Sequence, residues 1–163
     1  MTKLDGVILG SIERTLARDQ FESAYRQIGV LLRDFHKIQM EAFGYIGPHG
    51  IWTEYPTNYA YITSQFDRKL TEFRERGGPE ALALQVAAYA VEHGALLRER
   101  NRSVLCHNDL HAGNLLAKVA SAGIELCGVL DFENALAGDP LMDVAKAAYY
   151  LAGIMHGRLA NVA

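Results

Sequence analysis

Apolar positions in the first third of the chain follow the spacing of a helix. From Phe21 to Ile38 they recur at intervals of one turn, as on one face of an amphipathic helix. Asp19 and Glu22 have the spacing of a capping box, so we expect this helix to begin near residue 20 and to end before Gly44. Residues 1–18 are predicted to be an irregular lead-in.

The next part of the chain alternates between loop-like and helical patterns. Glycine, proline and aromatic residues fill residues 44–61, a composition typical of turns, and Trp52 is expected to anchor this loop. A short polar helix is predicted for residues 62–76 and a second long helix for residues 80–100, with a Gly-Gly-Pro break between them. Residues 19–102 are therefore expected to be mainly helical.

Beyond the second long helix the pattern changes to short apolar runs. Residues 104–106, 114–119 and 124–130 are predicted to be strands, and the Ser-Ala-Gly sequence between the last two predicts a hairpin. An Asp-Pro pair then opens a final helix that is expected to cover residues 139–163. The fold class is thus α+β and mainly α, with a loop and a hairpin over residues 103–135.

The composition fits one folded domain. Half of the 163 residues are apolar and 21% are charged, a balance that can cover a buried core. The net charge of -3 is too small to attract nucleic acid or an acidic membrane strongly. The sequence shows neither a leader pattern nor an apolar run of about 18 residues, and we therefore expect a single cytoplasmic domain over residues 1–163.

Three oxygen-bearing side chains follow the predicted strands. Asp109 and Asn114 belong to the segment H-N-D-L-H-A-G-N, and Asp131 follows the last apolar run in L-D-F-E. A D-x-x-x-x-N pattern with a later acidic residue is typical of phosphoryl-transfer sites. Mg²⁺ prefers such hard oxygen ligands, so Asn114 and Asp131 are predicted metal ligands and Asp109 is the predicted base. His107 is predicted to brace the loop.

A different interpretation treats the same loop as a hydrolytic metal centre. His107, Asp109 and His111 alternate along the chain, and on a strand they would share one face and could ligate zinc. Ala112 and Gly113 instead favour a turn at this point. The other histidines and the tyrosine pair near the C-terminus are interpreted as surface or packing residues.

The motifs H-N-D-L-H-A-G-N, L-D-F-E and G-D-P-L-M-D resemble those of the aminoglycoside phosphotransferase and choline kinase family. The resemblance implies a protein kinase-like large lobe with small β-hairpins around the catalytic loop. It implies Mg²⁺ as cofactor, and transfer of the γ-phosphoryl group of ATP to a hydroxyl of an aminoglycoside-like, choline-like or other small molecule. It also implies that Leu116 and Leu130 line the adenine pocket and that Asp143 braces the catalytic loop.

Two features depart from that family's pattern. Asn108 stands where the family commonly has glycine, and neither a glycine-rich phosphate loop nor its lysine is found. The small lobe is therefore expected to be absent. We expect a fragment of a longer enzyme, a homodimer or partner chain that supplies this lobe, or a catalytically silent binding or assembly module.

Three acidic residues near the final helix have two interpretations. Glu133, Asp139 and Asp143 form either a rim for a cationic acceptor or, as we favour, caps and braces around Pro140.

Overall fold

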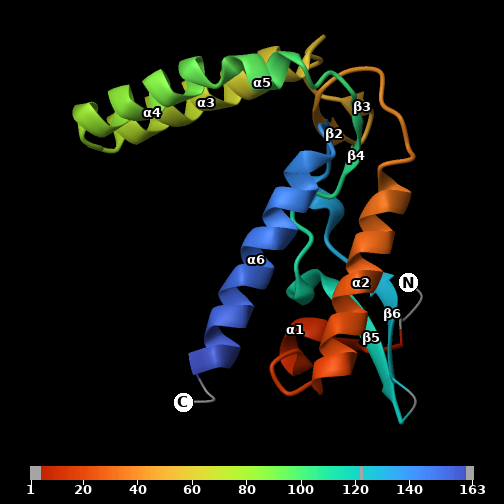
Figure 1. Ribbon diagram of the computed structural model, residues 1–163. Helices are drawn as coiled ribbons and strands as arrows, with labels where there is room; N and C mark the ends of the chain where they lie inside the picture. The colour runs from red at the N-terminus through yellow and green to blue at the C-terminus, as the bar shows by residue number, and fades with distance from the viewer. Residues whose placement is uncertain (1–4, 122, 161–163) are drawn as a thin grey trace.

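The computed structural model describes residues 5–121 and 123–160, with side chains described up to residue 155. In chain order the elements are β1 (Val7–Ile8), α1 (Leu9–Ile12), α2 (Arg18–Phe35), β2 (Gly44–Gly47), β3 (Gly50–Ile51), α3 (Asn58–Glu75), α4 (Glu80–Glu92), α5 (Gly94–Arg98), β4 (Val104–Cys106), the 3₁₀ turn η1 (Ala112–Asn114), β5 (Leu115–Ala120), β6 (Gly123–Val129), the 3₁₀ turn η2 (Phe132–Asn134), β7 (Leu136–Gly138) and α6 (Leu141–Ala160). Figure 1 shows α2 and α6 running lengthwise, whereas α3 and α4 pack side by side and project to one side. The fold is mixed and mainly helical, as the sequence predicts.

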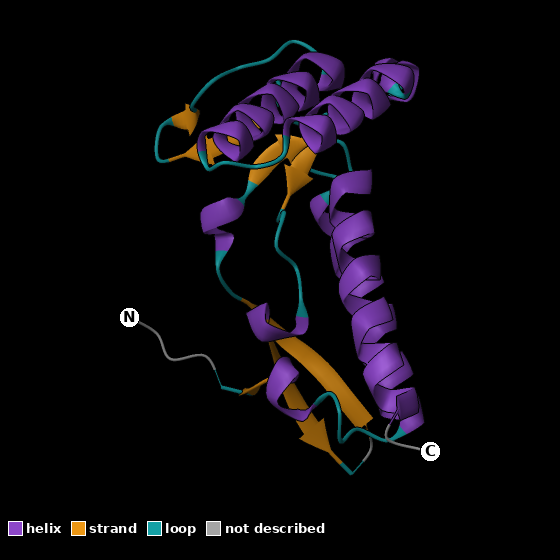
Figure 2. Cartoon of the chain, turned by 90° about the vertical axis from the view of Figure 1, so that its left-hand side faces the viewer, coloured by secondary structure: helices purple, strands orange, loops and turns teal. Residues whose placement is uncertain are grey.

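Two small antiparallel sheets frame the centre of the molecule. The strands of one sheet are ordered β1-β5-β6, and those of the other are ordered β3-β2-β7-β4. Figure 2 shows the sheets one above the other, with loop segments running between them. The segment that joins β4 to β5 therefore passes from one sheet to the other, and it carries the H-N-D-L-H-A-G-N motif.

Each sheet has its own hydrophobic core. Leu9 and Leu115 are fully buried in the core that α1 and α2 form with β5 and β6. Tyr61 of α3 and Val104 of β4 are buried in the second core. Burying one large apolar side chain stabilises a fold by roughly 1.5–3 kcal/mol. The two cores therefore hold the motif-bearing segment at both of its ends.

The prediction of an irregular lead-in over residues 1–18 is wrong for part of this range. Val7 and Ile8 form β1, which pairs Val7 with Ala117 of β5, and α1 follows directly. A strand this short shows no alternation in the sequence, and its partner lies far along the chain. Residues 1–4 lie outside the described part of the chain.

Helix α2 begins slightly before its predicted position and uses a different cap. The backbone N–H of Ala17 donates to Oε1 of Gln20 at 3.3 Å, in place of the predicted Asp19–Glu22 box. A glutamine in the first helical turn can accept this hydrogen bond as well as a glutamate can. The helix therefore starts at Arg18.

Residues 44–61 are not a loop throughout, because they contain the β2–β3 hairpin. Trp52 is 73% exposed, so the prediction that it anchors the loop is wrong. Its indole instead lies close to Gly47, where an added Cβ would collide with the ring. Helix α3 then begins at Asn58, with Oγ1 of Thr57 accepting a hydrogen bond from the backbone of the first turn.

The remaining helices and strands are present as predicted, with local exceptions. The helix predicted for residues 80–100 is divided between α4 and α5 at His93, and β7 has no counterpart in the sequence-based prediction. The predicted hairpin strands are present as β5 and β6, which pair Ala120 with Gly123; Ala122 lies outside the described residues. Among the described residues, none of the helices has the length and apolar character needed to span a membrane.

Candidate active site

His107 joins the β4–β5 loop to the segment that follows β6. The side chain is fully buried, and its Nε2 donates to the carbonyl of Leu130 at 2.9 Å. Its Nδ1 accepts a hydrogen bond from the backbone N–H of Asp109 at 3.3 Å. The ring of Phe132, from the L-D-F-E motif, packs against the imidazole with 4.6 Å between ring centroids. His107 therefore connects these two segments through both nitrogens of its ring.

These contacts argue against a zinc centre at this loop. A histidine ligates a metal through a ring nitrogen that carries no proton and no other donor. Both ring nitrogens of His107 already bind backbone groups, and Nδ1 of His111 accepts from the N–H of Gly113 at 3.0 Å. The three-residue cluster of the hydrolase interpretation does not form a ligand set in this geometry.

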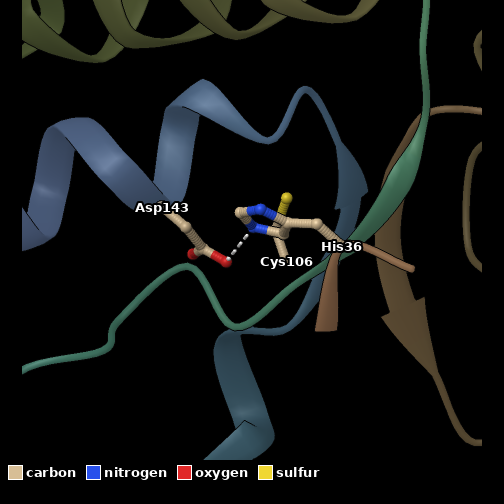
Figure 3. Close-up of side chains that lie close together, drawn as sticks. All are labelled: His36, Cys106 and Asp143. Atoms are coloured by element: carbon tan, nitrogen blue, oxygen red, sulfur yellow. Dashed lines mark hydrogen bonds and ion pairs between the residues drawn. The ribbon is translucent and has the colours of Figure 1, made fainter. Parts of the chain in front are cut away.

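Asp143 anchors the loop from the first turn of α6. Its Oδ2 accepts from the backbone N–H of His107 at 3.0 Å, and its Oδ1 accepts from that of Asn108 at 2.7 Å. Nε2 of His36, at the end of α2, donates to the same carboxylate at 3.2 Å (Figure 3). The Asp143 side chain is fully buried. A buried carboxylate with three donors is well compensated, so it ties α2, α6 and the loop together.

Cys106 lies next to this pair, as Figure 3 shows, and ligand atoms of His36, Cys106 and Asp143 all lie within 4.8 Å of one another. Burial raises the pKa of the Cys106 thiol, which keeps it protonated, and the nearby Asp143 and Asp139 act in the same direction. The thiol donates to the carbonyl of Asp139 at 3.5 Å. A neutral thiol and a carboxylate that already accepts backbone hydrogen bonds form a brace rather than a metal site.

Asp109 points toward α6. The hydroxyl of Tyr150 donates to its Oδ1 at 3.3 Å, and Nζ of Lys146 lies 3.7 Å from the same oxygen. Nε2 of His111 lies 3.8 Å from the other oxygen, Oδ2. Burial and, secondarily, the charge of Asp109 raise the pKa of Tyr150, so this phenol remains a donor at neutral pH. The carboxylate is a quarter exposed and open to a ligand.

Asn114 and Asp131 both lie just beyond one end of the β5–β6 ladder. The carbonyl of Asn114 accepts from the N–H of Leu130 at 2.8 Å, and Asp131 is the next residue. Nδ2 of Asn114 donates to the carbonyl of Asp109 at 3.0 Å, which links the third predicted site residue to the same ladder. The loop thus brings together residues that are distant in the sequence.

The oxygen atoms available here suit a hard cation. Because Nδ2 of Asn114 is turned toward Asp109, its Oδ1 is directed elsewhere; among the described residues, no hydrogen bond engages that oxygen. The Asp131 carboxylate is exposed and likewise has no hydrogen bond or ion pair within the described part of the chain. One amide and one carboxylate oxygen, together with water and phosphate oxygens, make up the kind of ligand set that Mg²⁺ uses.

Leu116 and Leu130 belong to the same sheet region. Leu116 pairs with Gly128 on β6. Leu130 follows β6 directly, and its backbone N–H donates to the carbonyl of Asn114 just before β5. Leu116 is 8% exposed and Leu130 is half-buried. Both leucines therefore lie near the end of the ladder where Asn114 and Asp131 are found.

Comparison with known proteins identifies the family. The model of the phosphotransferase enzyme family, APH, matches residues 1–160. The chain belongs to this family. Two solved structures of a thermostable mutant of aminoglycoside phosphotransferase APH(4)-Ia share its fold: the ternary complex with ADP and hygromycin B, at 19% identity and a TM-score of 0.69, and the apo form, at 20% identity and a TM-score of 0.66.

These matches cover 98% and 96% of the present chain, but 53% and 52% of the solved chains. This phosphotransferase-family chain therefore spans about half the length of the structures that it resembles. No curated protein matches it. The recognition of a kinase-like phosphotransferase fold from the sequence motifs is confirmed.

Asn108, the departure from the family's common glycine, adopts the backbone conformation that glycine favours. Its φ is 60°, in the left-handed region, which asparagine tolerates better than most residues. Its Nδ2 donates to the carbonyl of Asn134 at 3.1 Å, and its N–H binds Asp143. The loop geometry is therefore compatible with asparagine.

This conformation predicts an order of stability for two substitutions. Asn108→Gly and Asn108→Ala both remove the side-chain bond to Asn134, but only alanine places a Cβ in the left-handed region. We expect the glycine variant to be more stable than the alanine variant by about 1 kcal/mol. Urea unfolding followed by circular dichroism measures the difference. An alanine variant as stable as the glycine variant would show that this conformation is not retained in solution.

Sequence reasoning missed three side chains of this candidate site. His36 was assigned no role because a lone histidine on a helix is usually a surface or core residue. Tyr150 was assigned to packing, and Lys146 received no assignment. The signal that relates Lys146 and Tyr150 to Asp143 is their helical spacing, which places them on one face of α6.

Proposed function

We propose that this chain is the large lobe of a phosphotransferase that moves the γ-phosphoryl group of ATP to a hydroxyl of a small molecule. Asp109 is the base, and Asn114 and Asp131 are the Mg²⁺ ligands. One observation supports the proposal: Asn114 binds the backbone carbonyl of Asp109 and the backbone N–H of Leu130, the residue before Asp131, at one end of β5–β6. Membership of the phosphotransferase family supports the reaction type.

The chemistry of this proposal follows from the charge and position of Asp109. Its carboxylate accepts the proton of the acceptor hydroxyl while the hydroxyl oxygen forms a bond to the γ-phosphorus. The bond between that phosphorus and the β–γ bridging oxygen breaks, and ADP leaves with the electron pair. Mg²⁺ held by Asn114 and Asp131 would offset the negative charge on the phosphate oxygens. His107 and Asp143 keep the loop in place during the transfer.

Leu116 and Leu130 are proposed to support the adenine ring. The second half of a nucleotide clamp would come from another segment of a longer protein or from a partner chain, a homodimer included. The acceptor is proposed to be an aminoglycoside-like, choline-like or other hydroxyl compound. One solved relative is a ternary complex with ADP and hygromycin B, which supports a nucleotide and a small-molecule acceptor on this fold.

Metal-dependent nucleotide binding tests the proposal. Isothermal titration with ATP, in Mg²⁺ and then in EDTA, is expected to show binding that depends on the metal. Asn114→Ala and Asp131→Asn should each weaken the Mg²⁺-dependent affinity by about tenfold or more, because each removes one metal ligand. Asp67→Asn, on the exposed side of α3, is the matched control and should bind as the wild type does.

The result of this titration also separates the proposal from its alternative. ATP binding that is equal in Mg²⁺ and EDTA, or equal in wild type and Asp131→Asn, would contradict the assigned metal site. Absence of any ATP binding would favour the catalytically silent binding or assembly module, or a fragment separated from its small lobe. In that event the fold would be kept without the reaction.

A further inference from the structure

One face of α6 contacts three successive residues of the catalytic loop. Asp143, Lys146 and Tyr150 are spaced by three and four positions, so their side chains lie on the same side of the helix. Asp143 binds the backbone N–H groups of His107 and Asn108. Lys146 and Tyr150 continue this row toward Asp109. The helix face therefore follows the course of the loop.

Lys146 binds both the backbone and the side chain of the loop. Its Nζ donates to the carbonyl of Asn108 and lies 3.7 Å from Oδ1 of Asp109. Asp143 thus accepts from the backbone N–H of Asn108, and Lys146 donates to the carbonyl of the same residue. The left-handed backbone of Asn108 is therefore held on both sides, directly before Asp109.

The two oxygens of Asp109 have different surroundings. Tyr150 donates to Oδ1 at 3.3 Å, and Lys146 faces the same atom. Oδ2 has His111 Nε2 at 3.8 Å, which is too long for a hydrogen bond. One oxygen is therefore anchored to α6, and the other is left to accept a proton.

We propose that Lys146 and Tyr150 are positioning residues, which hold Oδ1 of Asp109 so that Oδ2 faces the hydroxyl of the acceptor. This inference rests on the proposed phosphotransferase function. An exposed lysine–carboxylate pair contributes little to stability, on the order of 0–1 kcal/mol. Its effect on the rate is larger, because a misplacement of about 1 Å in a reacting group can cost about a hundredfold.

Steady-state kinetics on Lys146→Met, Lys146→Arg and Tyr150→Phe test the proposal. Lys146→Met is expected to lower kcat by about tenfold to a hundredfold and to change the KM for ATP by less than about threefold. Lys146→Arg keeps the charge and should stay within about threefold of wild type. Tyr150→Phe should lose about threefold to tenfold in kcat. Lys69→Met, an exposed lysine of α3, is the control and should leave the rate unchanged.

Two outcomes would overturn the inference. One is a wild-type kcat in Lys146→Met; the other is an equal loss in the methionine and arginine variants together with a raised KM, which indicates a general structural defect. If wild-type protein shows no turnover and no ATP binding, the proposed function itself fails. In that case, amide hydrogen exchange at Asp109, followed by NMR in wild type and Lys146→Met, tests whether Lys146 holds Asp109 in place. Exchange about tenfold faster in Lys146→Met supports it, and unchanged exchange contradicts it.

Discussion

Asp109→Asn is expected to lower kcat by roughly 10²–10⁴-fold, with little change in fold or in Mg²⁺-dependent ATP affinity. Asparagine has nearly the same shape as aspartate and keeps an oxygen that accepts the hydrogen bond from Tyr150. It cannot take a proton from the acceptor hydroxyl. The effect should therefore fall on kcat, because the lost interaction exists only in the transition state.

A coupled assay of ADP release, with small-molecule hydroxyl acceptors, measures this effect, and the titration used for the metal site measures ATP affinity. Asp67→Asn carries the same chemical change on an exposed face of α3 and should retain the wild-type rate. Wild-type turnover in Asp109→Asn would remove Asp109 from the reaction. Loss of the circular dichroism spectrum would instead reveal a structural role for the carboxylate.

The local elements of the fold were predictable because their signals lie within a few residues. The Asp-Pro pair before α6 is an example, since Oδ1 of Asp139 accepts from the N–H of Leu141 at 2.8 Å, as a helix cap does. The β5–β6 hairpin is another, because two apolar runs flank a short turn sequence. In both cases the partners that stabilise the element are neighbours in the chain.

Short strands paired with distant residues were not predictable. β2 pairs Gly44 with Ala137 of β7, and β1 pairs Val7 with Ala117 of β5. Strands this short contain too few residues to show a period of two, and only the tertiary fold brings their partners together. Gly44 also has a φ of 148°, a conformation that favours glycine. In the sequence alone, a glycine at this point suggests a turn rather than a strand.

The candidate site shows the same contrast between residues with a local signal in the sequence and residues that meet only in the folded chain. Asp109, Asn114 and Asp131 were identified because their spacing is a property of one loop and the adjoining strands. His36 meets Asp143 across more than half of the chain, so no local pattern relates them. The two side chains that approach Oδ1 of Asp109 come from α6, and their contact depends on how that helix packs. Residues that support a site from other elements become visible only in the folded chain.

Asp143→Asn is expected to lower the free energy of unfolding by about 2–4 kcal/mol. The carboxylate accepts hydrogen bonds from the backbone of His107 and Asn108 and from His36, and it is fully buried. An asparagine amide offers only one acceptor oxygen, and its NH₂ group would face a backbone N–H. At least one buried donor would lose its partner, which typically costs about 1–3 kcal/mol, and more where the lost acceptor was charged.

Urea unfolding, followed by far-UV circular dichroism, measures this loss as a lower midpoint at an unchanged slope. Asp67→Asn is the matched control, because it makes the same substitution on the exposed side of α3 and should stay within about 0.5 kcal/mol of wild type. The loop depends on Asp143 for its backbone contacts with α6, so the variant should also exchange the amide protons of His107 and Asn108 faster. An Asp143→Asn protein with wild-type stability and wild-type exchange would mean that this carboxylate does not tie the loop to α6.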